Sequence, residues 1–574
     1  MKALLKYFKG YRGRAILAPI FKMLEAIFEL LIPLAVSRII DVGIGENRPD
    51  VIFSMCGVML ALGIIGLACA VFAQYFAAKA AVTFSTRLRS ELFTHIQSFS
   101  YSDTDKLGVS TLITRMTGDV NSVQTGINMF LRLFMRSPFI VFGAMIMAFT
   151  INSKLALIFA FAIPLLAIVV FGIMLISIPL YKKSQSSLDT VLGKIRSNYN
   201  GTRVVRAFNK EQDEISEFDT GNNSLTKILL FAGKISALMN PVTYVIINFA
   251  IIVLIKLGAI SIDSGVISQG ELVALYNYMS QILVELIKLA SLIITLNKAA
   301  ASASRVSSIM NTQPEKKNAP MTETINDSSV VSFKNVSFAY NTSGDPAVNN
   351  ITFSVAHGQT VGIIGGTGSG KTTLVNLIPL LYQPQNGEIF IKGKNSLLYT
   401  KNELCDIVGI VPQKAVLFKG SIRSNMKMSI KNATDEEIWK ALENAQAKDF
   451  VEDNQGLDTE VSQGGNNFSG GQKQRLTIAR ALLKKPEILI LDDSSSALDY
   501  VTESKLKRAI RDLDYSPTLF IISQRVSSII HSDLIIVLDD GEIVGMGTHK
   551  QLLENCNIYN DIYASQICQG GEDK

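Results

Sequence analysis

Cysteine is scarce in this sequence: there are five in 574 residues, and no two are spaced as CxxC. Cys56 and Cys69 lie within apolar runs, and the others are Cys405, Cys556 and Cys568. This usage argues against a disulfide framework and against a zinc site built on cysteine pairs. It favours buried thiols in a reducing compartment.

An excess of either charge is also missing. Lys and Arg total 55 against 49 Asp and Glu, and the resulting +6 is dispersed along the chain. This balance gives no indication of a nucleic-acid partner. Only 18% of the residues are charged, 48% are apolar and the mean hydropathy is +0.28, which excludes a disordered or simply soluble protein. A single hydrophobic core stops growing near about 250–300 residues, so more than one domain is expected, part of it in lipid.

The first half of the chain contains apolar stretches long enough to cross a hydrocarbon layer of about 30 Å. They predict six α-helical membrane spans, near 16–40, 52–77, 129–150, 155–180, 238–260 and 273–296. Two excursions between spans are long, polar and helix-patterned, so the spans that flank them are expected to continue into the cytosol.

Basic residues are distributed unevenly between the two sides of these spans. They gather in 1–14, 80–126 and 181–235, whereas the loop 41–50 has only Arg48 and the loop around 152 only Lys154. By the positive-inside rule, both termini of a multi-pass plasma-membrane protein are expected in the cytoplasm. The opening MKALLKYFKGYRGR lacks a signal-peptide pattern and predicts an interfacial helix.

Several charged residues lie within or near the predicted spans. Because charge in lipid is costly, they are expected to face the bundle interior or a wet cavity, or to extend from helix ends to the interface. One interpretation is a polar substrate path; the other is a hydrated vestibule stabilised by neighbouring charges. The residues are Lys22, Glu25, Glu29, Arg132, Arg136, Lys256, Glu285 and Lys288.

A polar stretch with two prolines and no apolar period, 311–329, follows the last span. It predicts a linker between a transmembrane domain, 1–310, and a soluble domain, 330–574.

The soluble half contains a phosphate-binding loop in its expected setting. The apolar strand 360–365 runs into GGTGSGKTT, and an apolar helix pattern follows. Glycines let backbone N–H groups surround phosphates at a helix N-terminus, with Lys371 on the β/γ-phosphates and the Thr372 hydroxyl on Mg²⁺. This predicts an α/β P-loop NTPase domain that binds ATP. The predicted binding residues are Gly365, Gly366, Thr367, Gly368, Ser369, Gly370, Lys371, Thr372 and Thr373.

A second apolar strand, PEILILDD (486–493), ends in two acids. Asp492 at its tip suits a carboxylate on the Mg²⁺ side of the nucleotide. Between the two strands, NNFSGGQKQRL places Ser469, Gly470 and Gly471 at the start of a helix, whose positive end suits an anion.

In order and spacing, these motifs resemble an ATP-binding cassette (ABC) exporter half-transporter, with six spans fused to one nucleotide-binding domain, over essentially the whole chain. FSGGQ resembles the family signature, although Leu is usual where Phe468 stands. The resemblance assigns Tyr340 to the adenine stack and Gln413 to Mg²⁺ and the membrane half. TEVSQGG (459–465) resembles the exporter loop before the signature, and Ser496–Asp499 the loop that contacts the partner's site.

The same resemblance implies a dimer, because in this family each ATP lies between one chain's P-loop and the other chain's signature. Ser469, Gly470, Gly471 and Gln472 would therefore meet the ATP of a partner. Coupling helices are expected near Ser102–Lys106 and Val205–Gln212.

The sequence departs from the family at two positions of one chemical step. Family members that hydrolyse ATP usually carry Glu where Asp493 stands and His where Gln524 stands. Asp withdraws its carboxylate by about 1 Å, a displacement able to cost about 10²-fold. Glutamine can donate a hydrogen bond to the γ-phosphate but cannot carry a proton or a positive charge as His can.

This combination resembles the degenerate-site subunit of heterodimeric bacterial multidrug ABC exporters. It predicts a chain whose own ATP site hydrolyses poorly and whose signature completes the active site of a partner that bears Glu and His. The cargo would be a small amphipathic molecule. The alternatives are a homodimeric exporter of peptides or lipids with slow ATPase activity, and an ATP-binding regulatory membrane subunit. The residues before residue 15 are too few for a leader-peptidase domain, so a leader-cleaving peptide exporter is disfavoured.

Overall fold

The computed structural model describes residues 6, 12–313, 322–325, 328–340 and 344–570. The chain divides into two compact units. The membrane unit comprises Met1–Ser98 and Leu107–Gln313, and the cassette unit comprises Phe99–Lys106 and Pro314–Lys574. Most of the expected interfacial helix (1–5 and 7–11) and much of the expected linker (314–321 and 326–327) lie outside the described residues, as does the side chain of Cys568.

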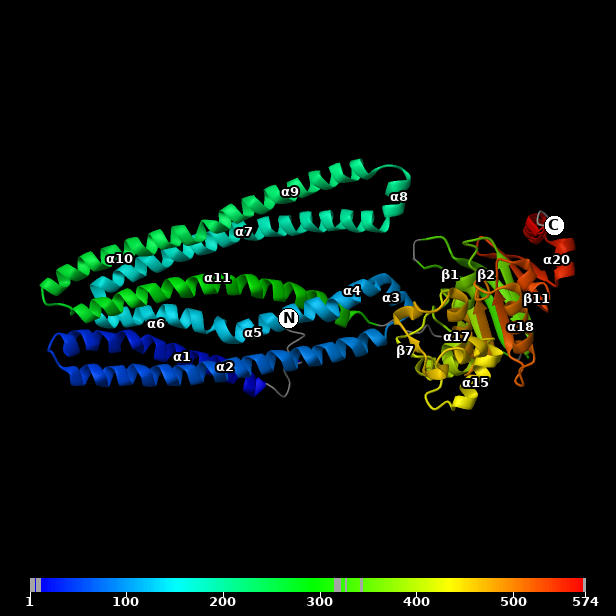
Figure 1. Cartoon of the computed structure of the whole chain (residues 1–574), viewed down its shortest axis with the longest axis horizontal. Helices are drawn as coiled ribbons and strands as arrows, with labels where there is room; N and C mark the ends of the chain where they lie inside the picture. The colour runs from blue at the N-terminus through cyan, green and yellow to red at the C-terminus, as the bar shows by residue number, and fades with distance from the viewer. Residues whose placement is uncertain (1–5, 7–11, 314–321, 326–327, 341–343, 571–574) are drawn as a thin grey trace. The chain divides into compact units, whose positions relative to one another are not determined.

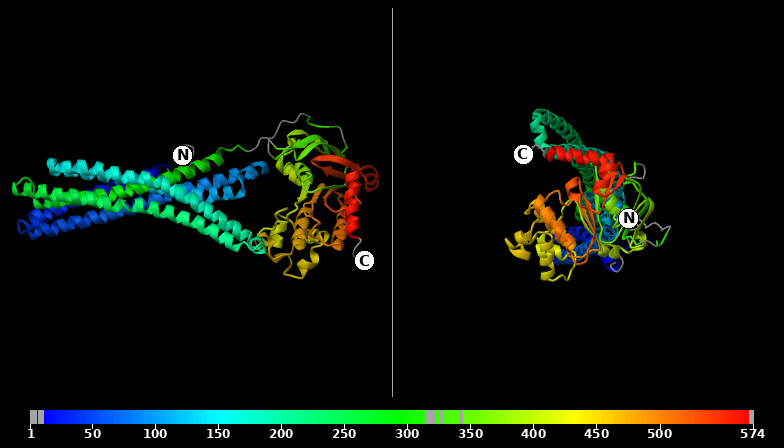
Figure 2. Two further views of the ribbon diagram at one scale, coloured as in Figure 1. Left: turned by 90° about the horizontal axis from the view of Figure 1, so that it is seen from above. Right: turned by 90° about the vertical axis from the view of Figure 1, so that its right-hand side faces the viewer.

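The membrane unit is built from long helices that lie side by side (Figures 1 and 2). The long helices are α1 (Arg12–Arg38), α2 (Pro49–Gln97), α5 (Val120–Met129), α6 (Arg136–Ile151), α7 (Ser153–Asn200), α9 (Glu211–Ala237), α10 (Met239–Asp263) and α11 (Gln269–Asn311). Shorter pieces connect them: η2 (Ile39–Ile44), α4 (Val109–Thr114), η3 (Arg115–Asp119), η4 (Phe130–Phe134) and α8 (Thr202–Ala207).

Helices are the expected solution in lipid, because each backbone polar group must find a partner within its own segment. Among the described residues, five helical segments are long and apolar enough to cross a membrane: Pro49–Gln97, Val109–Ile151, Ser153–Asn200, Glu211–Asp263 and Gln269–Asn311. The remaining predicted span, near 16–40, falls mainly in α1, which is not among these five and contains Lys22, Glu25 and Glu29. About 20 residues suffice to cross the bilayer, so helices of 49 and 48 residues such as α2 and α7 continue well beyond it.

Polar caps start two of the membrane helices. The Asn152 side chain accepts from the backbone N–H groups of Lys154 and Leu155 at 3.0 and 3.1 Å, and Asn152 alone separates the end of α6 from the start of α7. Ser268 and Glu271 form a capping box at the start of α11. Each cap satisfies N–H groups that the first helical turn leaves without partners.

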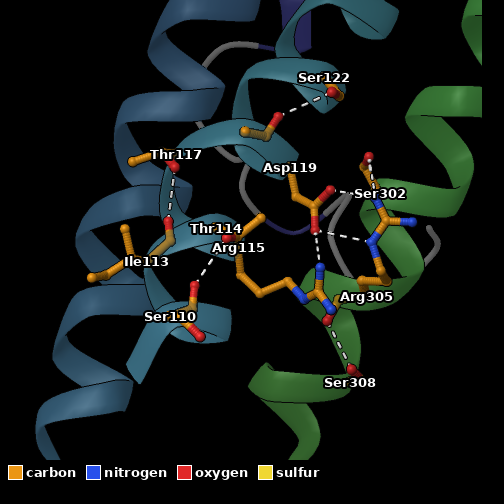
Figure 3. A network of polar contacts seen from close by, with 11 residues as sticks. Ser110, Ile113, Thr114, Arg115, Thr117, Asp119, Ser122, Ser302, Arg305 and Ser308 are labelled. Atoms are coloured by element: carbon orange, nitrogen blue, oxygen red, sulfur yellow. Dashed lines mark hydrogen bonds and ion pairs between the residues drawn. The ribbon is translucent and has the colours of Figure 1, made fainter. Parts of the chain in front are cut away.

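A buried carboxylate fastens η3 to α11 (Figure 3). Asp119 is 5% exposed and accepts from Arg115 Nη1 at 2.8 Å and from Arg305 Nε at 3.0 Å. Arg305 Nη2 donates to the other Asp119 oxygen and, at 2.9 Å, to Ser302 Oγ. A buried charge needs opposite charge and hydrogen bonds, and here they come from segments nearly two hundred residues apart.

The cassette unit contains two main sheets. A six-stranded sheet has the order β12-β11-β3-β10-β9-β6, parallel except for β12, and a four-stranded antiparallel sheet has the order β2-β1-β4-β5. The strands are β1 (Val331–Phe338), β2 (Val348–Val355), β3 (Thr360–Gly365), β4 (Asn386–Ile391), β5 (Lys394–Asn395), β6 (Val408–Val411), β9 (Ile488–Asp492), β10 (Thr518–Ile522), β11 (Leu534–Asp539) and β12 (Glu542–Gly547), with β7 (Gly420–Ser421) and β8 (Glu460–Val461) paired separately.

Helices accompany these sheets within the same unit. They are α3 (Tyr101–Leu107), whose last residue already belongs to the membrane unit, then α12 (Lys371–Leu377), α13 (Lys401–Ile407), α14 (Ile422–Met426), α15 (Asp435–Asn444), α16 (Lys448–Glu452), α17 (Gly470–Leu482), α18 (Tyr500–Arg511), α19 (Val526–Ile529), α20 (His549–Asn555) and α21 (Asn557–Gly570).

The parallel strands are buried on both faces. In β9, Ile488 and Ile490 enter one apolar cluster, whereas Leu489 and Leu491 enter another. This alternation follows from the two-residue period of a strand. It fixes the register of the sheet, and with it the positions of the loops that follow each strand.

Candidate nucleotide site

The P-loop follows β3, the third strand of the parallel sheet, and ends where α12 begins. Gly370 has φ 91°, and a Cβ at this residue would lie 2.3 Å from the carbonyl oxygen of Ala347, so only glycine fits. Lys371 is the first residue of α12. Its Nζ donates to the carbonyl oxygens of Gly365, at 2.9 Å, and Gly366, and to Ser369 Oγ at 3.1 Å.

The Lys371 side chain is buried close to the carboxylates of Asp492 and Asp493. Burial lowers the pKa of its ammonium group, and the carboxylates of Asp493 and Asp492 oppose that shift. A cation that has lost much of its hydration interacts strongly with an anion brought beside it. The loop therefore presents one positive charge and a ring of backbone groups to a phosphate.

Parallel strand order explains why distant residues meet at this loop. In register, Ile522 of β10 lies beside both Ile363 of β3 and Asp492 of β9. The carboxyl ends of β3, β10 and β9 therefore share one edge, the place where open α/β sheets bind ligands. Gln413 reaches the same edge from the loop after β6, which pairs with β9.

Direct contacts join the residues at this edge. Thr372 Oγ1 donates to Asp492 Oδ1 at 3.0 Å, and Gln413 Nε2 donates to Asp493 Oδ2 at 3.3 Å. Burial raises the pKa of Asp492, and Asp493 raises it further, whereas the Thr372 hydrogen bond and Lys371 lower it. Asp493 has φ 44°, and its N–H donates to the carbonyl oxygen of Ile522 at 3.0 Å.

A cavity of about 350 Å³ opens over these groups. Most of the residues proposed from the sequence to bind nucleotide or to act in hydrolysis line this cavity, and Ala347, Ile522 and Ser523 complete its walls. The sequence-derived residues in its lining are Tyr340, Thr367, Gly368, Gly370, Lys371, Thr372, Thr373, Gln413, Asp492, Asp493 and Gln524.

Tyr340 stands at the rim of this cavity, half-exposed after β1. Its hydroxyl lies 3.0 Å from Thr373 Oγ1, and its ring meets Phe338 and Tyr382 edge-on at centroid distances of 5.1 and 5.2 Å. An aromatic face held in this way is suited to stack on a base.

The signature residues lie elsewhere in the cassette unit. Ser469 caps α17, accepting from the Gln472 N–H at 3.3 Å, while the Gln472 side chain accepts from the Ser469 N–H at 2.9 Å. A Cβ on Gly471 would lie 2.9 Å from the Ala497 carbonyl oxygen, so the signature packs closely on the loop Ser496–Asp499. None of these residues lines the 350 Å³ cavity.

The first expected coupling segment, Ser102–Lys106, lies in α3, and Phe99–Lys106 belongs to the cassette unit. Here the structure adds a residue that sequence reasoning missed: the Tyr382 hydroxyl donates to Asp105 Oδ2 at 2.7 Å, and the Tyr101 ring lies 6.2 Å away. No local signal marks Tyr382, because its partner is 277 residues distant. The second expected segment, Val205–Gln212, spans the junction of α8 and α9 in the membrane unit.

In the membrane unit, Arg136 at the start of α6 joins carboxylates of two other helices. It donates to Glu285 Oε1 at 2.7 Å and to Glu29 Oε2 at 2.6 Å, and Glu285 also accepts from Ser137 and Lys288. Among the other charged residues expected near the spans, Lys22 pairs with Glu25 at 2.5 Å. Arg132 and Lys22 line a separate hollow, and the Lys256 side chain is exposed. A cavity of about 450 Å³ is lined by Glu29, Ile32, Pro33, Val36, Ile140, Asn277, Ser280, Gln281, Val284, Glu285 and Lys288.

Comparisons with known proteins agree with this arrangement. Residues 15–286 match the family described as ABC transporter transmembrane region, and residues 348–496 match the family described as ABC transporter. An ABC transporter ATP-binding protein of Mycobacterium tuberculosis is 34% identical over 98% of this chain and 97% of its own length. YfiB of Bacillus subtilis, also called an ABC transporter ATP-binding protein, is 35% identical over the full length of both.

A solved structure of a bacterial Atm1-family ABC exporter with ATP bound superposes with a TM-score of 0.79, covering 97% of this chain and 99% of that one. At 24% identity this likeness shows the fold alone. With the P-loop, the strand-end acids and the signature in place, the cassette unit is an ATP-binding ATPase domain. The chain is therefore a multi-pass membrane protein of the ABC transporter family, a half-transporter of exporter fold that joins a helical transmembrane domain to an ABC nucleotide-binding domain.

Proposed function

We propose that this chain is the degenerate-site subunit of a heterodimeric ATP-driven exporter of small amphipathic molecules. One observation carries the proposal: Asp493 and Gln524, the two departures from the family pattern, line the same cavity as Lys371. Both act on one chemical step, the attack of water on the γ-phosphate. Everything for nucleotide binding is retained beside them, which favours division of labour between unlike subunits over decay.

Within the site, each residue has a distinct task. Lys371 and the P-loop amides hold the phosphates, and Tyr340 stacks on the base. The Thr372 hydroxyl and the Asp492 carboxylate, 3.0 Å apart, and the Gln413 amide oxygen are hard oxygen donors of the kind Mg²⁺ takes. The ion, when bound, neutralises phosphate charge.

Hydrolysis is slow in this proposal because two groups fall short. The Asp493 carboxylate stops about 1 Å before the position of a Glu carboxylate, and Gln524 cannot accept and return a proton. The bound ATP then serves to bring the two cassettes together. Such a ligand shifts the conformational population by its differential affinity for the closed state, without being cleaved.

The partner is proposed to be a second half-transporter that carries Glu and His at these two positions. Ser469, Gly470, Gly471 and Gln472 of this chain would complete the partner's hydrolytic site. In support, these four signature residues are retained, the capping box of Ser469 and Gln472 is formed, and none of the four lines this chain's own cavity. A site of this design is incomplete in a single chain.

The membrane part of the proposal is alternating access across the plasma membrane by domains 1–310 and 330–574, joined by the linker 311–329, with six spans and both termini in the cytoplasm. The 450 Å³ cavity combines apolar walls with Glu29 and Lys288, which suits an amphipathic cargo in the lipid bilayer. In this proposal, closure of the cassettes is transmitted to the membrane domain through α3, whose Asp105 accepts a hydrogen bond from the Tyr382 hydroxyl.

The test compares the full chain purified alone with the chain co-expressed with a neighbouring half-transporter gene. We expect ATP binding by the chain alone with little phosphate release, and brisk Mg²⁺-dependent turnover and dye accumulation in inverted vesicles by the pair. Rapid turnover by the chain alone would favour the homodimeric exporter. ATP binding by a pair that moves no dye, lipid or peptide would favour a regulatory subunit.

A further inference from the structure

A glutamine near the end of the last described helix reaches the loop that carries Gln524. Gln566 of α21 donates from Nε2 to the carbonyl oxygen of Gln524 at 2.7 Å. Its Oε1 accepts from the backbone N–H of Val526 at 2.8 Å. One side chain thus holds the switch loop, the segment 523–525 between β10 and α19, by contacts with the residues on both sides of Arg525.

The chemistry of this contact requires a carboxamide. Gln offers an acceptor and donors on one planar group, the same pair that a peptide offers to a neighbouring strand. Glu would keep the acceptor for Val526 but lose the donor for Gln524, and Met would lose both at nearly the same size.

The helix that carries Gln566 is firmly seated. Tyr559 of α21 is fully buried, and its hydroxyl lies 2.7 Å from His549 Nδ1 of α20. Ile562 and Tyr563 pack against the apolar cluster that contains Val526. Figure 2 shows α21, in red, against the cassette unit. The Gln566 carboxamide is therefore held in place by the packing of α21, and its two hydrogen bonds hold the switch loop relative to that helix.

The other end of the switch loop is already fixed by the sheet. The Ser523 N–H donates to the Ile363 carbonyl oxygen at 3.2 Å, and the Arg525 N–H donates to Ser523 Oγ at 2.9 Å. With Gln566 on the far side, the backbone of Gln524 is held on both flanks. Its side chain lines the cavity with Lys371 and Asp493.

We propose that Gln566 is a positioning residue that holds the switch loop, so that the C-terminal helix α21 sets where the Gln524 side chain meets the terminal phosphate of ATP. This inference rests on the proposed function of the cavity. It adds a route by which displacement of the C-terminal helix would change ATP affinity without altering any residue that touches nucleotide.

The first arm of the test needs no nucleotide. Amide hydrogen exchange across 522–528 is measured in the full chain in nanodiscs for the wild type, Gln566→Met, Gln566→Glu and the matched surface control Ser565→Ala. Loss of one hydrogen bond predicts roughly tenfold faster exchange at Val526 in the Met variant. The Glu variant should keep the protection of Val526, whose N–H still has an acceptor, and the Ser565 control should keep the wild-type protection throughout. Unchanged exchange at Val526 in Gln566→Met would overturn the proposal.

The second arm measures the affinities for ATP and ADP. Gln566→Met should weaken ATP binding several-fold and leave ADP binding unchanged, because ADP lacks the phosphate that Gln524 faces. Added to Gln524→Ala, it should have no further effect on ATP. Equal weakening of both nucleotides, or additive losses in the double variant, would refute positioning through Gln524. A wild-type chain that binds no ATP would refute the proposed function instead. The hydrogen-exchange experiment would then still show whether Gln566 holds the switch loop.

Discussion

The proposed function predicts that restoring the two family residues, Glu and His, turns a slow ATP site into a working one. In the structure Asp493 Oδ2 lies 3.3 Å from Gln413 Nε2, at the long end of a hydrogen bond, and shares the cavity with Gln524. Asp493→Glu adds one methylene and advances the carboxylate by roughly 1 Å toward the terminal phosphate. Gln524→His replaces an amide with a group that can carry a proton.

The size of the gain follows from these two deficits. A misplacement of about 1 Å costs about 10²-fold, and a positioned general base contributes about 10²–10⁴-fold. We therefore expect the double variant to release phosphate at least about 10²-fold faster than the wild type, equivalent to about 2.7 kcal/mol of barrier. Each single variant should gain less, because both groups serve one step.

The assay is phosphate release at saturating MgATP by the full chain in nanodiscs, expressed per cross-linkable dimer. ATP affinity and thermal unfolding are measured in parallel, since Asp493 has φ 44° and a longer side chain is less favoured there. Lys371→Ala in the double variant is the control and should abolish the gain. A wild-type chain that already turns over as fast as the double variant would refute the reasoning, as would a double variant that binds ATP, forms dimers and gains nothing.

Three further predictions follow from contacts in the two units. Lys371→Ala removes the buried ammonium from the P-loop, and because hydrogen bonds to charged groups are worth about 1.5–3 kcal/mol each, ATP affinity should fall by roughly 10- to 100-fold in a fluorescent-nucleotide titration. Tyr382→Phe keeps the ring but loses the hydrogen bond to Asp105, so nucleotide binding should persist while transport by the assembled exporter in vesicles declines several-fold. Arg136→Met leaves the buried Glu285 with Lys288 as its remaining charge partner and removes the pair with Glu29, which should destabilise the membrane unit by up to about 3–5 kcal/mol in thermal unfolding.

Each of these changes has a matched control. Lys392→Ala removes an exposed lysine of the same unit and should leave nucleotide affinity unchanged. Tyr399→Phe deletes a hydroxyl bound to the Ile391 carbonyl oxygen, away from α3, and should spare transport. Adding Glu285→Gln to Arg136→Met should recover part of the lost stability. An Arg136→Met chain that melts like the wild type would contradict the stabilising role given to the ion pairs of Arg136 with Glu29 and Glu285.

The nucleotide site was largely predictable from the sequence, because its parts are local motifs. A P-loop is a strand, a glycine turn and a helix start within about a dozen residues, so Gly370, Lys371 and Thr372 reveal themselves by spacing alone. The departures at Asp493 and Gln524 were visible only through the resemblance to ABC exporters, which supplies the residues usual at these two positions. Six apolar stretches likewise gave the helical class of the membrane half, although Lys22, Glu25 and Glu29 interrupt the apolar stretch of α1.

Tertiary structure alone decided which distant residues support these motifs. Tyr382 meets Asp105 across 277 residues, and Gln566 meets the switch loop across about forty. Arg136 finds Glu29 and Glu285 on helices before and after its own. A sequence motif consists of residues that are neighbours along the chain, so it can be recognised from the sequence. Residues that hold a motif in place are brought to it by strand order and helix packing, and neither of the two segments in contact carries a sequence pattern that reveals the contact.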